Sequence, residues 1–66
     1  MYYVKDMDES FSSVSKLEKG IKAWIKRKFP GERSYEFQPF KQMDYRTMVM
    51  NVRMPTHTYG VWIVIV

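Results

Sequence analysis

The only histidine, His57, is the first candidate for nucleophilic or metal chemistry. It lies in an expected turn, Pro55 to Thr58, between two threonines, and the chain has no cysteine and no GxSxG motif. Nucleophilic catalysis needs a base held beside the nucleophile, and zinc needs three or four ligands. No further ligand or base clusters with His57 in the sequence. We therefore predict a solvated turn residue, with no catalytic residue and no metal site.

Three acidic residues near the N-terminus, Asp6, Asp8 and Glu9, are the next candidates. Paired carboxylates can act as acid and base or hold Mg²⁺. Helix capping explains them more simply, because Asp6 and Glu9 are three residues apart, as in a capping box, and Asp8 or Ser10 is an alternative N-cap. No GxGxxG or GxxxxGK[ST] pattern occurs. We expect a non-enzymatic protein without a cofactor.

A basic segment is the first feature that favours binding. The net charge is +4, and seven basic residues face two acidic ones between Lys16 and Arg33. On the solvent side of a helix such residues can follow the phosphates of RNA or DNA, or they can keep a small protein soluble. An outer sheet face could add base stacking. The residues of this alternative nucleic-acid surface are Lys16, Lys19, Lys22, Lys26, Arg27, Tyr45 and Arg53.

The C-terminal segment supports the leading functional hypothesis. It has no polar residue after Gly60, and successive side chains of a strand point to opposite faces. One helix covers one face of a sheet, so one apolar set stays uncovered unless the sheet curls or tyrosines cover it. The two sets are Val61, Ile63 and Ile65, and Trp62, Val64 and Val66. Exposed apolar patches usually mark binding sites, and the predicted protein interface is Tyr59, Val61, Trp62, Ile63, Val64, Ile65 and Val66.

The mode of binding follows from the position of this strand. At a sheet edge, its backbone could pair with a second copy or with a target by strand addition. We expect a small regulator or inhibitor that occludes a partner's surface or assembles through the strand, with a homodimer as the simplest assembly. By analogy, small chains of this kind are typical of accessory proteins encoded by phages and mobile elements. The identity of the partner is left open.

Length and composition limit what can surround these sites. A chain of 66 residues supports one domain, residues 1–66. Without cysteine, its reinforcement must come from a second chain or from dense packing of aromatic rings, which are 17% of the residues. The missing cysteines fit a cytoplasmic setting. The acidic first ten residues do not fit a signal peptide, and Val61 to Val66 is far shorter than the roughly 20 residues of a membrane span.

An apolar stripe with helical spacing predicts one amphipathic helix. It should begin near residue 8 or 9 and end near Lys28, because Pro30 cannot continue it and Pro30–Gly31 favours a turn. Gly20 falls on the solvent side, where it costs up to about 1 kcal/mol relative to alanine. The stripe comprises Phe11, Val14, Leu17, Ile21, Trp24, Ile25 and then Lys28 or Phe29.

Four strands are expected beside this helix. Residues 2–4 favour a short strand, residues 34–38 alternate until a proline, and residues 41–44 are polar enough for a hairpin loop. Residues 45–54 then alternate, and residues 59–66 form the last strand. If the first strand paired in parallel with a later one, the crossover would be right-handed.

The methionines of the long alternating strand indicate where the core lies. Met48, Met50, Val52 and Met54 share one face, which should pack on the helix. The fold class is therefore predicted as α+β, two-layer, with one amphipathic helix on a four-stranded, mainly antiparallel sheet in the order β-α-β-β-β.

Overall fold

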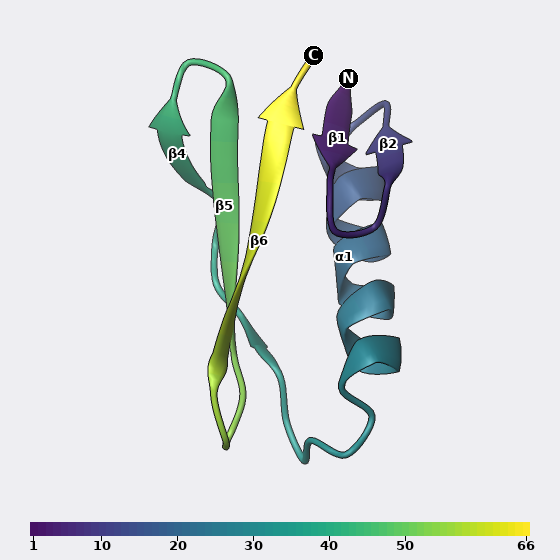
Figure 1. The fold of residues 1–66 in the computed structure, drawn as a ribbon, viewed down its shortest axis with the longest axis vertical. Helices are drawn as coiled ribbons and strands as arrows, with labels where there is room; N and C mark the ends of the chain where they lie inside the picture. The colour runs from purple at the N-terminus through teal and green to yellow at the C-terminus, as the bar shows by residue number, and fades with distance from the viewer.

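The computed structural model describes all 66 residues, and its elements form an antiparallel sheet with one helix on one of its faces (Figure 1). The elements are β1 (Tyr2–Val4), β2 (Glu9–Phe11), α1 (Val14–Lys28), β3 (Glu36–Phe37), β4 (Lys41–Asp44), β5 (Thr47–Arg53) and β6 (Thr58–Ile65). The predicted α+β class is confirmed, with six strands rather than four. The helix is neither long enough nor apolar enough to cross a membrane.

The strand order is β2-β1-β6-β5-β3, and β4 also pairs with β5. Every pairing is antiparallel, so no parallel crossover exists. β6 runs between β5 and β1, but β1 covers only its last part, Ile63–Ile65. Thr58–Trp62 pairs with β5 alone. The C-terminal strand is therefore an interior strand where its sequence is most apolar, and strand addition is not available there.

The helix begins later than predicted. Ser13 is its N-cap, with extended backbone and a side chain that accepts a hydrogen bond from the Lys16 N–H. The residues assigned to the first helical turn form β2 instead, which pairs with β1. The predicted capping box is wrong, because the residues before β2 form a turn in which Asp8 has a φ of 52°. The predicted end at Lys28 is confirmed.

Two predictions about the middle of the chain are also corrected. The expected strand over residues 34–38 is reduced to Glu36–Phe37, although Tyr35 and Phe37 do share a face, with their rings stacked 6.1 Å apart. The expected loop over residues 41–44 is a strand, β4, and the turn lies at Tyr45 and Arg46. Pairing with β5 overrides the polar composition of β4, which is exposed along its whole length.

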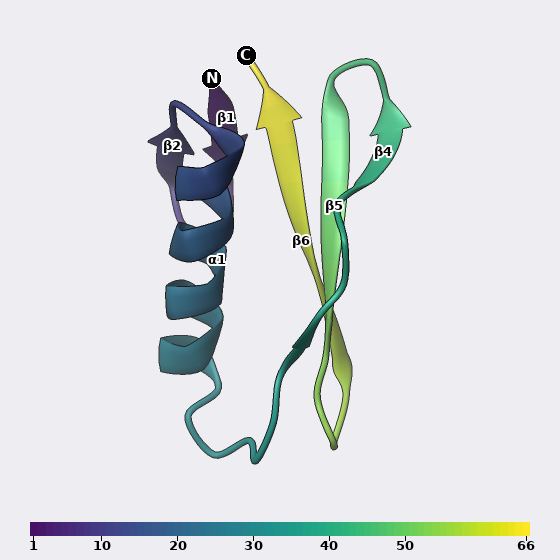
Figure 2. The ribbon, with the colours of Figure 1, turned by 180° about the vertical axis from the view of Figure 1, so that it is seen from behind.

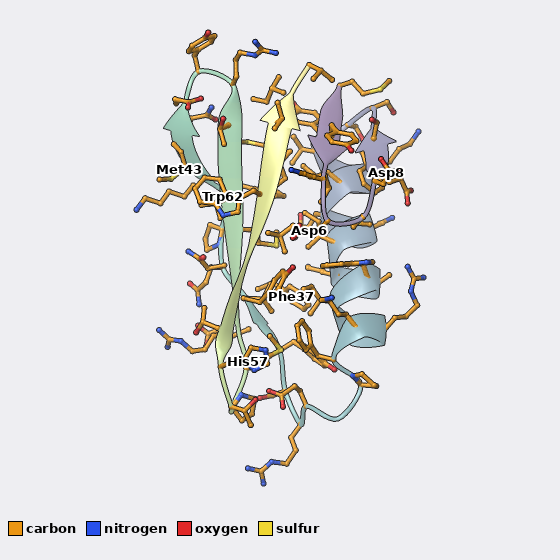
Figure 3. All side chains as sticks on the ribbon, viewed as in Figure 1. Asp6, Asp8, Phe37, Met43, His57 and Trp62 are labelled. Atoms are coloured by element: carbon orange, nitrogen blue, oxygen red, sulfur yellow. The ribbon has the colours of Figure 1, made fainter.

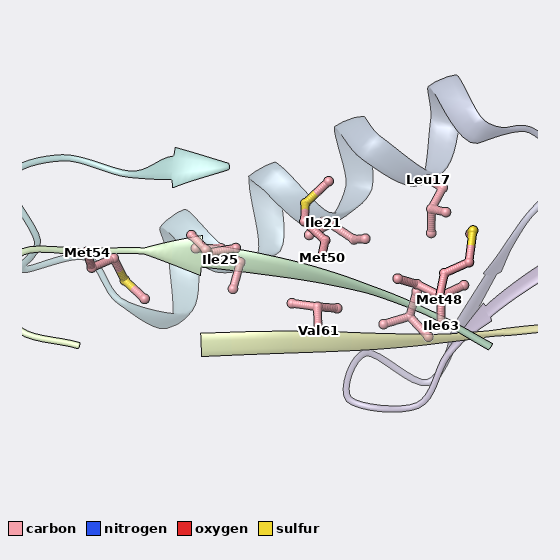
Figure 4. Close-up of a cluster of buried hydrophobic side chains, with 10 residues drawn as sticks. Leu17, Ile21, Ile25, Met48, Met50, Met54, Val61 and Ile63 are labelled. Carbon is pink, nitrogen blue, oxygen red and sulfur yellow. The ribbon is translucent and has the colours of Figure 1, made fainter. Parts of the chain in front are cut away.

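The core forms where the helical stripe meets the methionine face, as predicted (Figure 4), except that Val14 at the start of the helix is 44% exposed. Leu17, Ile21 and Ile25 are fully buried, and they pack with the inward side chains of three strands. Those side chains are Val4, Met48, Met50, Val52, Met54, Val61 and Ile63. Burial of each large apolar side chain contributes about 1.5–3 kcal/mol. The core therefore fixes which residues of β5 and β6 must point away from the helix.

Gly20 has a packing role that its sequence position did not indicate. A Cβ at Gly20 would lie 2.4 Å from the Phe11 Cζ, because the Phe11 ring reaches from β2 onto the helix backbone. Phe11 was assigned to the helical stripe only because its spacing fits a helix. It covers the helix from a neighbouring strand, and the glycine provides the room for its ring.

We expect Gly20→Ala to destabilise the native protein by about 1 kcal/mol, because displacement of the ring outweighs the gain in helix propensity. In a Phe11→Ala background the same change should stabilise by up to about 1 kcal/mol. Urea unfolding of the four proteins measures this double-mutant cycle. Stabilisation by Gly20→Ala in the native background would show that the ring does not need the glycine.

Candidate functional site

The face of the sheet opposite α1, called here the outer face, carries no covering element (Figures 1 and 2). Trp62 is 48% exposed, Val64 is half-buried and Val66 is exposed, whereas Val61 and Ile63 on the other face are fully buried. Figure 3 shows Trp62 directed away from the helix. The structure thus selects the second of the two apolar sets, and we call Trp62, Val64 and Val66 the apolar patch.

The remaining members of the predicted interface belong to the helix side. Tyr59 and Ile65 are partly buried and pack against the core. The Tyr59 ring lies 6.0 Å from the Trp24 ring and 5.4 Å from the Phe29 ring. Val61 and Ile63 are fully buried and cannot belong to an exposed interface, whereas Tyr59 and Ile65 are partly buried on the helix side.

The strand register arranges the outer face in rows of paired residues. Lys41, Val49 and Trp62 form one row across β4, β5 and β6. Val49 is only 5% exposed although no helix covers it, because its row neighbours have long side chains that flank it. Asn51 pairs with Gly60 in the next row. The outer face is therefore apolar around Trp62 and becomes polar one row further along.

A polar pocket occupies that second region, with a volume of about 380 Å³. Its lining combines two cations with amide and hydroxyl groups and includes no apolar side chain other than a proline ring. The lining residues are Gln38, Pro39, Lys41, Asn51, Arg53 and Thr58. Of these residues the sequence analysis had named only Arg53 for the sheet, and Lys41 was missed because residues 41–44 were expected to form a loop.

The predicted nucleic-acid surface is divided by the fold. Lys16, Lys19, Lys26 and Arg27 are exposed on α1, on the opposite side of the sheet from Arg53. The Lys22 ammonium is 3.0 Å from the Glu18 carboxylate and lies over the Phe37 ring. Tyr45 is 86% exposed in the β4–β5 turn, about 26 Å along β5 from Arg53. These residues lie on two separate surfaces, the exposed side of α1 and the outer part of the sheet, and nucleic-acid binding by the helix side stays a prediction.

His57 has partners that its sequence neighbourhood did not reveal. Its Nδ1 is 2.9 Å from the Thr56 hydroxyl and 3.8 Å from a Glu32 carboxylate oxygen, and that hydroxyl also donates to Glu32 at 2.7 Å. In a catalytic triad the hydroxyl and the carboxylate contact opposite ring nitrogens, whereas here both contact Nδ1. The cluster ties the β5–β6 turn to the loop after α1. No three His, Asp or Glu side chains come together that could hold a metal ion.

The acidic residues of the β1–β2 turn accept hydrogen bonds from tyrosines. The Tyr59 hydroxyl donates to Asp6 at 2.8 Å, and the Tyr3 hydroxyl donates to Asp8 at 2.9 Å. Burial, followed by the hydrogen bond to Asp6, raises the pKa of Tyr59. The hydrogen bond to Asp8 is the main cause of the raised pKa of Tyr3. These carboxylates hold a turn in place, which explains their clustering without any acid–base role.

No protein-family model matches the chain, and no match to it was found among curated proteins or solved structures. The outer face must therefore be interpreted from its own geometry.

The raised pKa of Tyr59 predicts a specific loss of stability in alkali. The protonated tyrosine is favoured in the folded state, so its contribution is complete below the ordinary pKa of 10.0 and is lost as pH rises through the folded-state pKa. Tyr59→Phe should lower the melting temperature at about pH 8, and its difference from the native protein should shrink towards about pH 11. A difference that stays constant with pH would contradict this assignment.

Proposed function

We propose that the protein is a non-enzymatic protein-binding module that acts through its outer face. The observation that supports this is Trp62, a large aromatic side chain that is 48% exposed on a sheet face that no helix covers. Tryptophan is enriched among the residues that dominate protein–protein binding energy. Val64 and Val66 extend the same patch along β6. A partner that covered this patch would remove it from water.

The proposed mode is occlusion of a surface rather than strand addition. Around Val64 the backbone of β6 is paired with β5 on one side and β1 on the other. Val64 is therefore held on the interior part of the strand, next to Trp62 at the end of the segment that pairs with β5 alone. An anchor held by paired strands loses little conformational freedom when it binds. This supports a small regulator or inhibitor that occupies its partner's surface, with a second copy of the chain as the simplest partner.

The setting proposed for this activity is the cytoplasm. The chain has no cysteine, and small secreted domains usually rely on disulfides. An accessory role for a phage or mobile element remains part of the proposal by analogy alone.

Two neighbouring lysine substitutions test the proposal. Val64→Lys should leave the protein folded and weaken binding by tenfold or more, on the order of 1.4 kcal/mol, because it puts a charge into the patch. Ile63→Lys should unfold the protein, because Ile63 is 0% exposed and an unpaired ammonium would be buried. Circular dichroism measures folding, and light scattering over a concentration series measures self-association.

The matched control is Lys19→Glu, which changes charge on the exposed side of α1. Affinity capture from cell extract with the native protein, Val64→Lys and Lys19→Glu extends the test to other partners. The proposal predicts assembly or capture that Val64→Lys loses and Lys19→Glu keeps. The proposal would be overturned if the native protein stays monomeric and Val64→Lys captures every protein that the native chain captures.

A further inference from the structure

The polar pocket holds two positive charges without partners. The ion pairs of the protein lie elsewhere, on the helix and at the β5–β6 turn, so neither Lys41 nor Arg53 forms one. Glu36 pairs with Arg53 in the β3–β5 register, but its carboxylate accepts a hydrogen bond from the Gln38 amide and does not line the pocket. Two cations that converge on one hollow favour an anionic ligand.

Beside the pocket, one row of the outer face has no side chain on β6. Gly60 lies opposite Asn51, and a Cβ there would stand 3.3 Å from the Asn51 Oδ1 and 3.9 Å from the Trp62 indole nitrogen. The indole thus borders the row that leads into the pocket. Trp62 and Gly60 are on the same face, about 7 Å apart along the strand.

We propose that this region binds single-stranded nucleic acid, with phosphates held by Lys41 and Arg53 and a base stacked on Trp62. Single-strand binders combine cations that follow the backbone with aromatic rings that stack on bases. Asn51 and Thr58 add donors and acceptors that suit base edges and sugar hydroxyls. An acidic peptide such as oligo-aspartate would satisfy the two cations, but it has no aromatic base to stack on the half-exposed indole beside them. This site shares Trp62 with the apolar patch, whereas Lys41 and Arg53 lie in the pocket, outside the patch.

The test is fluorescence anisotropy with fluorescein-labelled oligo(dT) and oligo(U), both of about 12 nucleotides, at two salt concentrations. Native protein should bind at low salt, and each of Lys41→Gln and Arg53→Gln should reduce the salt slope by about 0.7. Trp62→Ser should weaken binding on the order of tenfold. Circular dichroism confirms that each variant is folded.

The matched controls are Lys19→Gln and Lys26→Gln, which remove the same charge from the exposed helix face. They should leave affinity nearly unchanged, and inorganic phosphate, a mononucleotide and oligo-aspartate should compete far less well than oligo(U). No binding by the native protein at low salt would overturn the proposal. So would equal losses from the helix variants, or equal competition by oligo-aspartate.

The same variants separate this site from the protein-binding patch. Lys41→Gln and Arg53→Gln should leave self-association and capture unchanged. Val64→Lys, which lies outside the pocket and adds a positive charge, should keep oligonucleotide binding. If Val64→Lys lost both protein binding and oligonucleotide binding, the two activities would belong to one surface, and the proposal of a separate nucleic-acid site would be overturned.

Discussion

The antiparallel pairing of β5 with β6 is the constraint on which the rest of the structure depends. It runs without interruption from Thr47 opposite Val64 to Arg53 opposite Thr58. Side chains alternate along both strands, so a shift of one residue would send the methionines to solvent and Trp62 into the core. The register therefore determines both layers at once, since it gives α1 its apolar surface and leaves the outer face with Trp62, Gly60 and the pocket.

The helix and the apolar face of β5, which this register brings together, were both predicted from patterns between residues close in sequence. The helical stripe from Leu17 to Ile25 and the alternation of Met48, Met50 and Val52 each depend on residues within a few positions, and both were correct. β2 and β4 were not predicted, because neither has an apolar pattern of its own and each exists through a partner strand. The helix start was wrong for the same reason, since the spacing of Phe11 fits a helix and a strand packed on one equally well.

The candidate site was less predictable than the core. The sequence reduced the apolar surface to two sets but could not choose between them, because the choice depends on which set faces α1. The pocket was not foreseen as a whole, since it joins residues from β4, β5, β6 and the segment after β3 across paired rows. A single sequence does not show that Lys41 and Asn51 lie on one face, or that Asn51 stands opposite Gly60.

The pairing of β1 with β6 has a consequence for how the protein is made. The Met1 amino group donates to the Val66 carbonyl at 3.0 Å, and the Val66 N–H donates to the Met1 carbonyl at 2.8 Å. β1 leaves the ribosome before β6, so its pairing depends on a strand that is made later. Contacts of such long sequence separation are slow to form because a large loop must close first. During synthesis the β1–β2 hairpin therefore has no partner strand until β6 has emerged, and only then can the sheet be completed.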